Sequence, residues 1–252
     1  MPAWPFPLWI AHRGAGKLAP ENTLAAFRVG AGYGYRAFEC DVKLSADDVP
    51  FLLHDATLER TTCESGNAGD RLWAQLSLID AGAWHSRGFA GEPLASLASI
   101  AAYVRGNDYA LDLEIKPTPG HEEPTGRIVA HHVRQLWAGA ATPPLLSSFR
   151  PESLAGARDA APELPRALLL ETLWPGWFEM ASSMGCVAVI TDYRVMDSTV
   201  LGRLRSAGLR GLCYTVNDPA DAQRLLDLGI DGLITDAVDR FPPAPQAGTP
   251  LA

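Results

Sequence analysis

Basic residues are scarce in this sequence. Lysine and arginine together number 21 against 29 aspartates and glutamates, so the formal net charge is -8 over 252 residues. Proteins that bind nucleic acid without sequence preference need a basic surface, and this balance excludes that class. An anionic small molecule can still bind, because a local cluster of cations can oppose the sign of the net charge.

Closely spaced cysteines are also missing. The four cysteines form neither a CxxC pair nor a spacing typical of zinc sites; they are Cys40, Cys63, Cys186 and Cys213. We expect them to behave as small buried side chains in a reducing compartment.

Long apolar runs are absent as well, so no segment is expected to cross a bilayer. The first basic residue is Arg13, and three prolines interrupt the residues before it, which is not typical of a signal peptide. We therefore expect a cytoplasmic protein that binds neither membranes nor nucleic acid. The sequence gives no indication of the oligomeric state.

What the sequence does contain is a repeated pattern of short aliphatic runs and helix-length amphipathic segments. Over about 250 residues this alternation predicts a (β/α)8 TIM barrel, with a doubly wound open sheet as the alternative. We count nine candidate strands, one more than such a barrel requires. Two of them, "AFECDVKL" and "VPFLLHD", follow each other closely, so one arm of this hairpin is expected to extend beyond the barrel.

Residues 56–93 interrupt the alternation. The segment holds five glycines and two tryptophans and shows no regular hydrophobic period. An insertion of this length with tryptophans is more typical of a small folded cap than of a disordered loop. We expect one barrel domain over residues 1–240 that carries this inserted subdomain, followed by a proline-rich tail at 241–252.

Acidic side chains alternate with apolar ones in two of the predicted strands. Glu39 and Asp41 share one face of "AFECDVK", and Asp112 and Glu114 share one face of "YALDLEIK". Helices cover the outside of a barrel, so the charged faces are expected to point inward. Glu39, Asp41 and Glu114 together predict an all-oxygen site for a divalent cation, Mg²⁺ or Ca²⁺, with Mn²⁺ as a further option.

Two histidines lie where predicted strands end. His12 follows "LWIA" and His54 follows "PFLL", and two imidazoles beside one metal can serve as general acid and general base near neutral pH. Arg13 offers a planar fork of donors and Lys116 a point charge, and both suit a phosphoryl group. This combination predicts metal-assisted cleavage of a phosphodiester.

A structural role is the alternative for several of these residues. The three acids could form a salt-bridge network with Arg13 and Lys116 in place of a metal site. Asp112 is expected to support Lys116 or a metal ligand from behind.

Polar residues outside the strand ends favour structural roles. Glu21, Asn22 and Thr23 are expected to begin a helix. Asn217 is expected to belong to a second helix start, with a contact into the pocket as the alternative. His85 lies in the insert and is expected to pack there, with an approach to the substrate as the alternative.

Eight motifs occur in a fixed order along the chain: "HRG", "PENTLAAF", "FECDVKL", "LLHDATLERTT", "LDLEIKP", "SSF", "YTVN" and "GIDGLITD". Each motif alone is weak, but the ordered set resembles the glycerophosphodiester phosphodiesterase family, in particular its bacterial cytoplasmic members. The resemblance covers nearly the whole sequence, and the insert is similar to the small subdomain of those members.

The resemblance implies a TIM barrel that hydrolyses glycerophosphodiesters, which are small soluble molecules, to sn-glycerol 3-phosphate and an alcohol. It implies that His12 and His54 are the acid and base, that the three acids hold the metal, and that Arg13 and Lys116 bind the phosphate. It further implies attack by the glycerol 2-hydroxyl, with a cyclic phosphate that water then opens. Tyr214 stands where the family often has tryptophan, so the aromatic wall of the substrate pocket is expected to differ in shape.

Two other functions remain open at this point. A lyase of the same fold would release a cyclic phosphate from a lysophospholipid-type substrate. A protein that binds glycerophosphodiesters without turnover is the second, although binding alone does not require a full set of acids, bases and metal ligands. The preferred head group, the metal and the assignment of acid and base to the two histidines stay open.

Overall fold

The computed structural model describes residues 4–241 and 243, and within them eight parallel strands close into a barrel. The first strand pairs with the last, Ala11 opposite Thr235, and also with the second, Ala11 opposite Phe38, which closes the ring. The barrel strands are β1 (Trp9–Ala11), β2 (Ala37–Leu44), β4 (Ala110–Ile115), β5 (Leu145–Ser148), β6 (Arg166–Leu170), β7 (Ala188–Asp192), β8 (Arg210–Tyr214) and β9 (Gly232–Thr235). This arrangement confirms the predicted TIM barrel and removes the open-sheet alternative.

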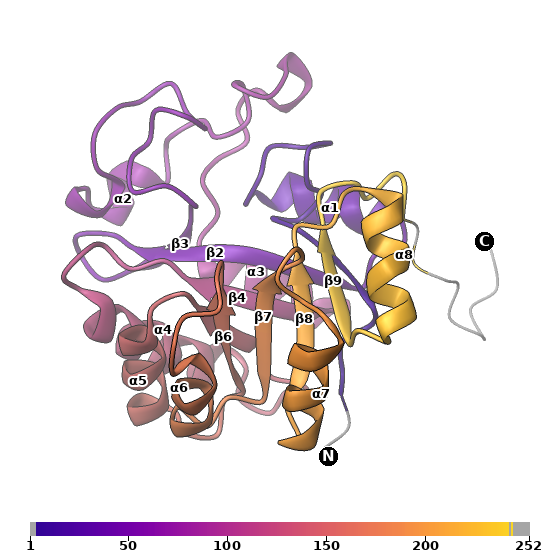
Figure 1. Ribbon diagram of the computed structural model, residues 1–252. Helices are drawn as coiled ribbons and strands as arrows, with labels where there is room; N and C mark the ends of the chain where they lie inside the picture. Colours follow the sequence, from indigo (N-terminus) through magenta and orange to yellow (C-terminus); the bar gives the residue numbers. More distant parts are fainter. Residues whose placement is uncertain (1–3, 242, 244–252) are drawn as a thin grey trace.

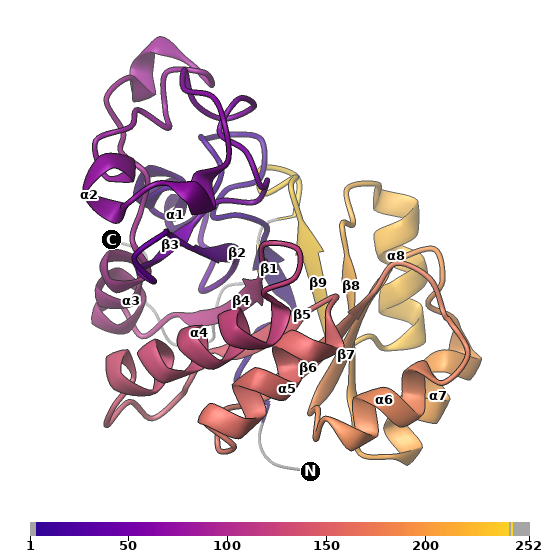
Figure 2. The same cartoon turned by 90° about the vertical axis from the view of Figure 1, so that its left-hand side faces the viewer.

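Helices follow the strands and cover the outside of the barrel (Figures 1 and 2). They are α1 (Leu24–Gly32), α3 (Leu97–Gly106), α4 (Glu122–Leu136), α5 (Pro151–Ala160), α6 (Trp177–Ser183), α7 (Ser198–Ser206) and α8 (Pro219–Leu228). No helix in the described part of the chain combines the length and the apolar character needed to cross a membrane.

The ninth strand, β3 (Pro50–Leu52), runs antiparallel to the end of β2, and Val42 lies opposite Leu52. It belongs to the hairpin arm that extends past the barrel, as the close spacing of the two motifs predicts. His54 lies two residues after the end of this strand, so the hairpin brings a residue that is not on a barrel strand to the mouth of the barrel.

Alternation along β2 and β4 divides their side chains between two environments. Phe38, Cys40 and Val42 face outward and are fully buried under the helices, in the same cluster as Leu111 and Leu113. The opposite faces turn inward, where small and aliphatic side chains such as Ala37 and Ala110 fill the lower part of the barrel. Towards the carboxyl ends of the two strands the inward positions become acidic. This is where the candidate site lies.

The segment from 56 to 93 forms a separate small layer on the side of the barrel from which β2 and β3 emerge (Figures 1 and 2). It contains two short 3-10 turns, Ala68–Asp70 and Arg87–Phe89, and the single-turn helix α2 (Trp73–Leu76). Its apolar side chains pack onto the hairpin, in a buried cluster made of Phe51, Leu53, Leu58, Ala68, Leu76, Ile79, Ala81 and Leu94.

The four cysteines are free thiols. Cys40, Cys186 and Cys213 are buried, as expected, whereas Cys63 in the insert is exposed, which corrects the expectation for that residue. Its position in the insert, away from the regular strands and helices, leaves nothing to pack over it.

Candidate active site

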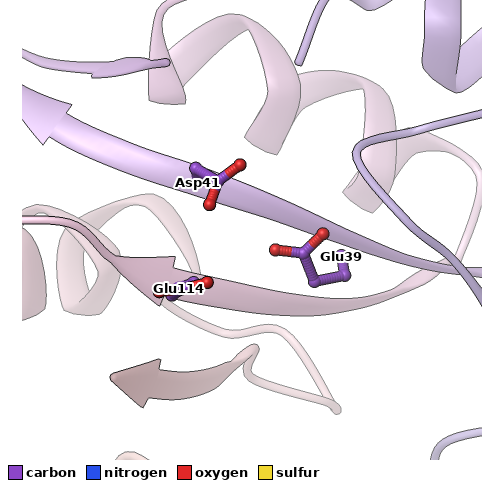
Figure 3. Close-up of side chains that lie close together, drawn as sticks. All are labelled: Glu39, Asp41 and Glu114. Atoms are coloured by element: carbon purple, nitrogen blue, oxygen red, sulfur yellow. The ribbon is translucent and has the colours of Figure 1, made fainter. Parts of the chain in front are cut away.

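Three carboxylates converge inside the mouth of the barrel. Glu39 and Asp41 come from β2 and Glu114 from β4, and the strand register places Asp41 directly opposite Glu114 (Figure 3). One oxygen atom from each side chain lies within 4.8 Å of the other two. All three residues are buried, with exposed fractions of 4%, 1% and 7%. The alternating pattern read from the sequence therefore does bring these side chains together.

The charges of this cluster are mutually unfavourable. Burial, together with repulsion from Asp41, raises the pKa of Glu39 and of Glu114 above the ordinary value. Burial would raise the pKa of Asp41 too, but the cations Arg13 and Lys116 outweigh it and keep that pKa low. Three ionised carboxylates at this spacing need a cation between them. Their oxygen atoms form the donor set that Mg²⁺ or Ca²⁺ prefers.

One atom of the cluster supports this fit to a metal. Oδ1 of Asp41 is buried and accepts no hydrogen bond from the described residues. A buried acceptor without a donor is costly, and a coordinated ion is one way to satisfy it. The residues present thus fit a divalent cation.

Two basic side chains border the acids. Nε of Arg13 lies 3.4 Å from Oδ2 of Asp41, and its backbone N–H donates to Oε2 of Glu39 over 3.0 Å. Nζ of Lys116 lies 2.7 Å from Oε1 of Glu114 and 3.6 Å from Oδ1 of Asp41. The salt bridges considered from the sequence are therefore present, and they coexist with an acid cluster that exceeds what two cations neutralise.

His12 is anchored by an aspartate that directly follows the last strand. Its Nδ1 lies 2.6 Å from Oδ1 of Asp236, whose other oxygen accepts from the amide of Asn217 over 3.0 Å. Nε2 of His12 faces the acid cluster, 3.7 Å from Oε2 of Glu39. An ionised carboxylate only accepts hydrogen bonds, so the contact with Asp236 keeps a proton on Nδ1 of His12. Nε2 is then left to exchange protons in the pocket.

His54 is anchored in the same way. Its Nδ1 lies 2.6 Å from Oδ1 of the adjacent Asp55. Burial is the largest influence on His54 and lowers the pKa of the imidazole, so the neutral form is favoured. Sequence reasoning did not assign a role to Asp55 or to Asp236, although both stand in motifs noted there.

A pocket of about 160 Å³ unites the two histidines with the acids. Of the eight predicted site residues, seven line it: His12, Arg13, Glu39, His54, Glu114, Lys116 and Tyr214. Asp41 lies beside it in the acid cluster. The ring of Tyr214 packs edge-on against Phe149, with centroids 5.7 Å apart, and these two rings form an aromatic wall.

Two residues expected to begin a helix belong to the site instead. Thr23 does cap α1 and accepts the N–H of Ala26. Asn22, however, donates to Oδ2 of Asp41 over 2.8 Å and accepts the backbone N–H of the same residue over 3.0 Å. Glu21 pairs with Arg13 over 2.8 Å. The expectation for Glu21 and Asn22 is wrong, because the turn before α1 directs both side chains inward.

The structure places the remaining open residues in different surroundings. Nε2 of His85 lies 3.0 Å from the carbonyl of Lys17, and the ring packs on Phe89 away from the pocket lining. Asn217 supports Asp236 and does not line the pocket. Asp112 lines the pocket floor, but its hydrogen-bond donor is Ser147 at 2.7 Å and not Lys116 as considered. Burial raises the pKa of Asp112 to about 7.

Comparison with known proteins gives consistent results. The family model described as the glycerophosphoryl diester phosphodiesterase family matches residues 12–240. A glycerophosphodiester phosphodiesterase from Caldanaerobacter subterraneus is 30% identical over 233 residues, which is 91% of this chain and 93% of the relative. A phosphodiesterase from Oleispira antarctica, solved in complex with the product sn-glycerol-3-phosphate, superposes with a TM-score of 0.88 at 31% identity and covers 93% of this chain and 95% of its own. A glycerophosphodiester phosphodiesterase from Agrobacterium tumefaciens superposes with a TM-score of 0.79 at 27% identity, covering 93% and 98%.

Proposed function

The chain belongs to the glycerophosphoryl diester phosphodiesterase family, and on that premise we propose that it hydrolyses small glycerophosphodiesters to sn-glycerol 3-phosphate and an alcohol, with a divalent metal and two histidines. The observation that carries the proposal is the meeting of two carboxylate-anchored imidazoles and a three-carboxylate cluster in one pocket. The product-bound structure of the Oleispira relative supports the choice of substrate class.

Glu39, Asp41 and Glu114 would hold the metal. When bound there, a divalent cation would stabilise negative charge on the phosphoryl oxygens and favour ionisation of the attacking hydroxyl. The three acids also keep the site selective for a hard cation, because all of its ligands are oxygen atoms.

Arg13 and Lys116 would bind the phosphate from two directions. Both are tethered to the acid cluster, so their charges are fixed before the substrate arrives. Fixed donors lose little entropy on binding and stabilise the extra charge of the pentavalent transition state. The aromatic wall of Tyr214 and Phe149 would contact the glycerol carbons or the head group.

His12 and His54 would transfer the protons. In the reaction that the family implies, one ring accepts the proton of the glycerol 2-hydroxyl as it attacks phosphorus, and the other protonates the departing alkoxide. Water then opens the cyclic phosphate with the two roles exchanged. Asp236 and Asp55 hold the ring orientation, since each accepts from Nδ1 and leaves Nε2 for the substrate.

The test uses glycerophosphocholine and glycerophosphoethanolamine with Mg²⁺, Ca²⁺ or Mn²⁺, followed by phosphorus NMR. We expect glycerol 3-phosphate as the final product and a loss of turnover of about 10²- to 10⁴-fold in His12→Ala and His54→Ala, with the fold retained by circular dichroism. A cyclic phosphate that accumulates as the final product would instead identify a lyase. Full activity in both variants, or binding without product, would contradict the proposed mechanism.

A further inference from the structure

One guanidinium at the start of the insert clamps two carboxylates at the rim of the site. Nε and Nη2 of Arg60 donate to the two oxygens of Asp55 over 2.6 and 3.1 Å. Nη1 and Nη2 donate to the two oxygens of Glu21 over 2.7 and 2.8 Å. All three nitrogens of Arg60 are therefore used, and each carboxylate is held by two parallel bonds.

Each clamped carboxylate has a second partner inside the pocket. Oδ1 of Asp55 lies 2.6 Å from Nδ1 of His54, and Oε1 of Glu21 accepts from Nη1 of Arg13 over 2.8 Å. A continuous chain of hydrogen bonds thus runs from one predicted proton-transfer group, through Arg60, to one predicted phosphate-binding group. These two groups come from different parts of the fold, the β2–β3 hairpin and the loop after β1.

The contacts of Arg60 are better suited to orienting the two carboxylates than to stabilising the fold. The side chain of Arg60 is 43% exposed, and ion pairs that water reaches contribute little to folding. A planar fork bound twice in a bidentate manner nevertheless fixes the rotation of both carboxylates, which a single ammonium group would not do. Fixing Asp55 fixes the ring of His54. Fixing Glu21 holds Nη1 of Arg13 through the hydrogen bond between them. Nη2 of Arg13 makes no hydrogen bond within residues 4–241 and 243.

We propose that Arg60 is a positioning residue of the active site, which sets the orientation of His54 and Arg13 together through Asp55 and Glu21. The inference rests on the proposed function of this pocket and adds to it a role for the insert. The insert supplies Arg60 in its first turn, where the hydroxyl of Thr62 donates to the carbonyl of Leu58 over 2.7 Å. The inserted segment then takes part in arranging the catalytic groups.

The experiment compares Arg60→Ala and Arg60→Lys with a control in the same insert, Arg71→Ala. Arg71 pairs with Glu64 over 3.1 Å and has no contact with the pocket lining. Removing a residue that orients catalytic groups typically costs about 10- to 100-fold in activity. We expect kcat/KM to fall by that factor in both Arg60 variants, with kcat reduced through His54 and KM raised through Arg13. Arg71→Ala should stay within about twofold of the wild type.

Two further measurements separate positioning from a general loss of structure. Guanidinium chloride at millimolar concentration should restore part of the activity of Arg60→Ala in a saturable manner, and sodium chloride at equal ionic strength should not. In a double-mutant cycle, Arg60→Ala should cost less in an Asp55→Asn background than in the wild type, because both changes disturb the same contact.

Arg60→Ala activity within about twofold of the wild type would overturn the inference, as would wild-type activity in Arg60→Lys. If Arg60→Ala does not fold, Arg60→Lys carries the same test. Failure of the proposed function would look different, because the wild type itself would then be inactive. In that case calorimetry with inorganic phosphate still tests the Arg13 half, since Arg60→Ala should bind phosphate about tenfold more weakly than the wild type.

Discussion

Replacing Asp236 with asparagine changes one atom of the contact that anchors His12. In the wild type the carboxylate accepts two hydrogen bonds on opposite sides, one from Nδ1 of His12 and one from the amide of Asn217. Oδ1 of the Asn217 side chain is already occupied, because it accepts the backbone N–H of Asp236 over 2.8 Å. Asn217 therefore cannot turn its amide over to suit a new neighbour.

This constraint decides which way an asparagine at position 236 must point. Its oxygen has to face the amide group of Asn217, so its own NH₂ group faces Nδ1 of His12. Nδ1 then becomes an acceptor, and the neutral ring carries its proton on Nε2, the atom that faces the pocket. A ring in this tautomer can donate a proton from Nε2 but cannot accept one there.

The expected size of the effect depends on the role of His12. If His12 is the base in the first step, kcat should fall by about 10³- to 10⁴-fold, the range seen when a catalytic histidine is held in the wrong tautomer. If His12 is the acid, the first step retains its proton donor and should slow by about 10-fold at most, but His12 is then the base of the second step, so the cyclic phosphate should accumulate. The variant thus assigns acid and base between His12 and His54, which geometry alone leaves open.

Stability should change in a predictable direction with pH. Burial would raise the pKa of Asp236, but the hydrogen bond and charge of His12 lower it from 3.8 to about 2. A carboxyl with a lowered pKa stabilises the fold above its unfolded pKa and loses that effect as pH falls towards the folded value. The shift corresponds to about 2 kcal/mol at pH 7, lost between about pH 4 and pH 2. Asp236→Asn should remove this dependence.

The assay combines steady-state kinetics, nitrogen-15 NMR of the imidazole tautomer, and urea unfolding at several pH values. Asp231→Asn is a matched control at the other end of β9, where the side chain pairs with Arg210 over 2.8 Å far from the pocket lining. It should lower stability and leave kcat unchanged. An Asp236→Asn protein with wild-type kcat, or with Nδ1 still protonated in the neutral ring, would refute the reasoning.

Two further perturbations test the metal site and the loop after β1. Saturating Mg²⁺ or Ca²⁺ should raise the melting temperature of the wild type, by the equivalent of about 2.7 kcal/mol at 100 times the Kd, and a chelator should abolish activity. Glu39→Gln should lose both responses. An unchanged metal-induced shift in this variant would contradict the assignment of Glu39 as a metal ligand. Gly16→Ala should destabilise the protein by roughly 2–3 kcal/mol and reduce activity, because φ at Gly16 is +57° and a Cβ would lie 2.1 Å from the carbonyl oxygen of Asp236. Gly32→Ala, where a Cβ meets nothing within 4 Å, is the control, and equal unfolding midpoints for the two variants would show that the loop tolerates a side chain.

The fold and the acid cluster could be predicted from the sequence because both depend on local periodicity. Alternation with period two fixes which face of a strand each side chain occupies, and helices on the outside of a barrel make the charged face the inner one. Glu39, Asp41 and Glu114 followed from these two facts alone. Their register across β2 and β4, with Asp41 opposite Glu114, needed the three-dimensional pairing.

Glu21 and Asn22 were misread for a physical reason. Both precede a helix, where short polar side chains commonly cap the first turn, and Thr23 does this. Asn22 instead adopts a left-handed backbone conformation with φ of 60°, which turns its amide towards Asp41. Nothing in the local sequence distinguishes that turn from an ordinary helix start, because its partner lies 19 residues away.

The contact between Asp236 and His12 could have been predicted from the closure of the barrel. It is 224 residues from His12 in sequence, yet the first and last strands of a closed barrel must be neighbours. Ala11 pairs with Thr235 here, so the residues that follow them, His12 and Asp236, emerge side by side at the same end. A polar residue directly after the last strand could therefore have been matched to one directly after the first as soon as a barrel was inferred. Arg60 had no such signal, because the insert carries no strand register from which its neighbours could be inferred.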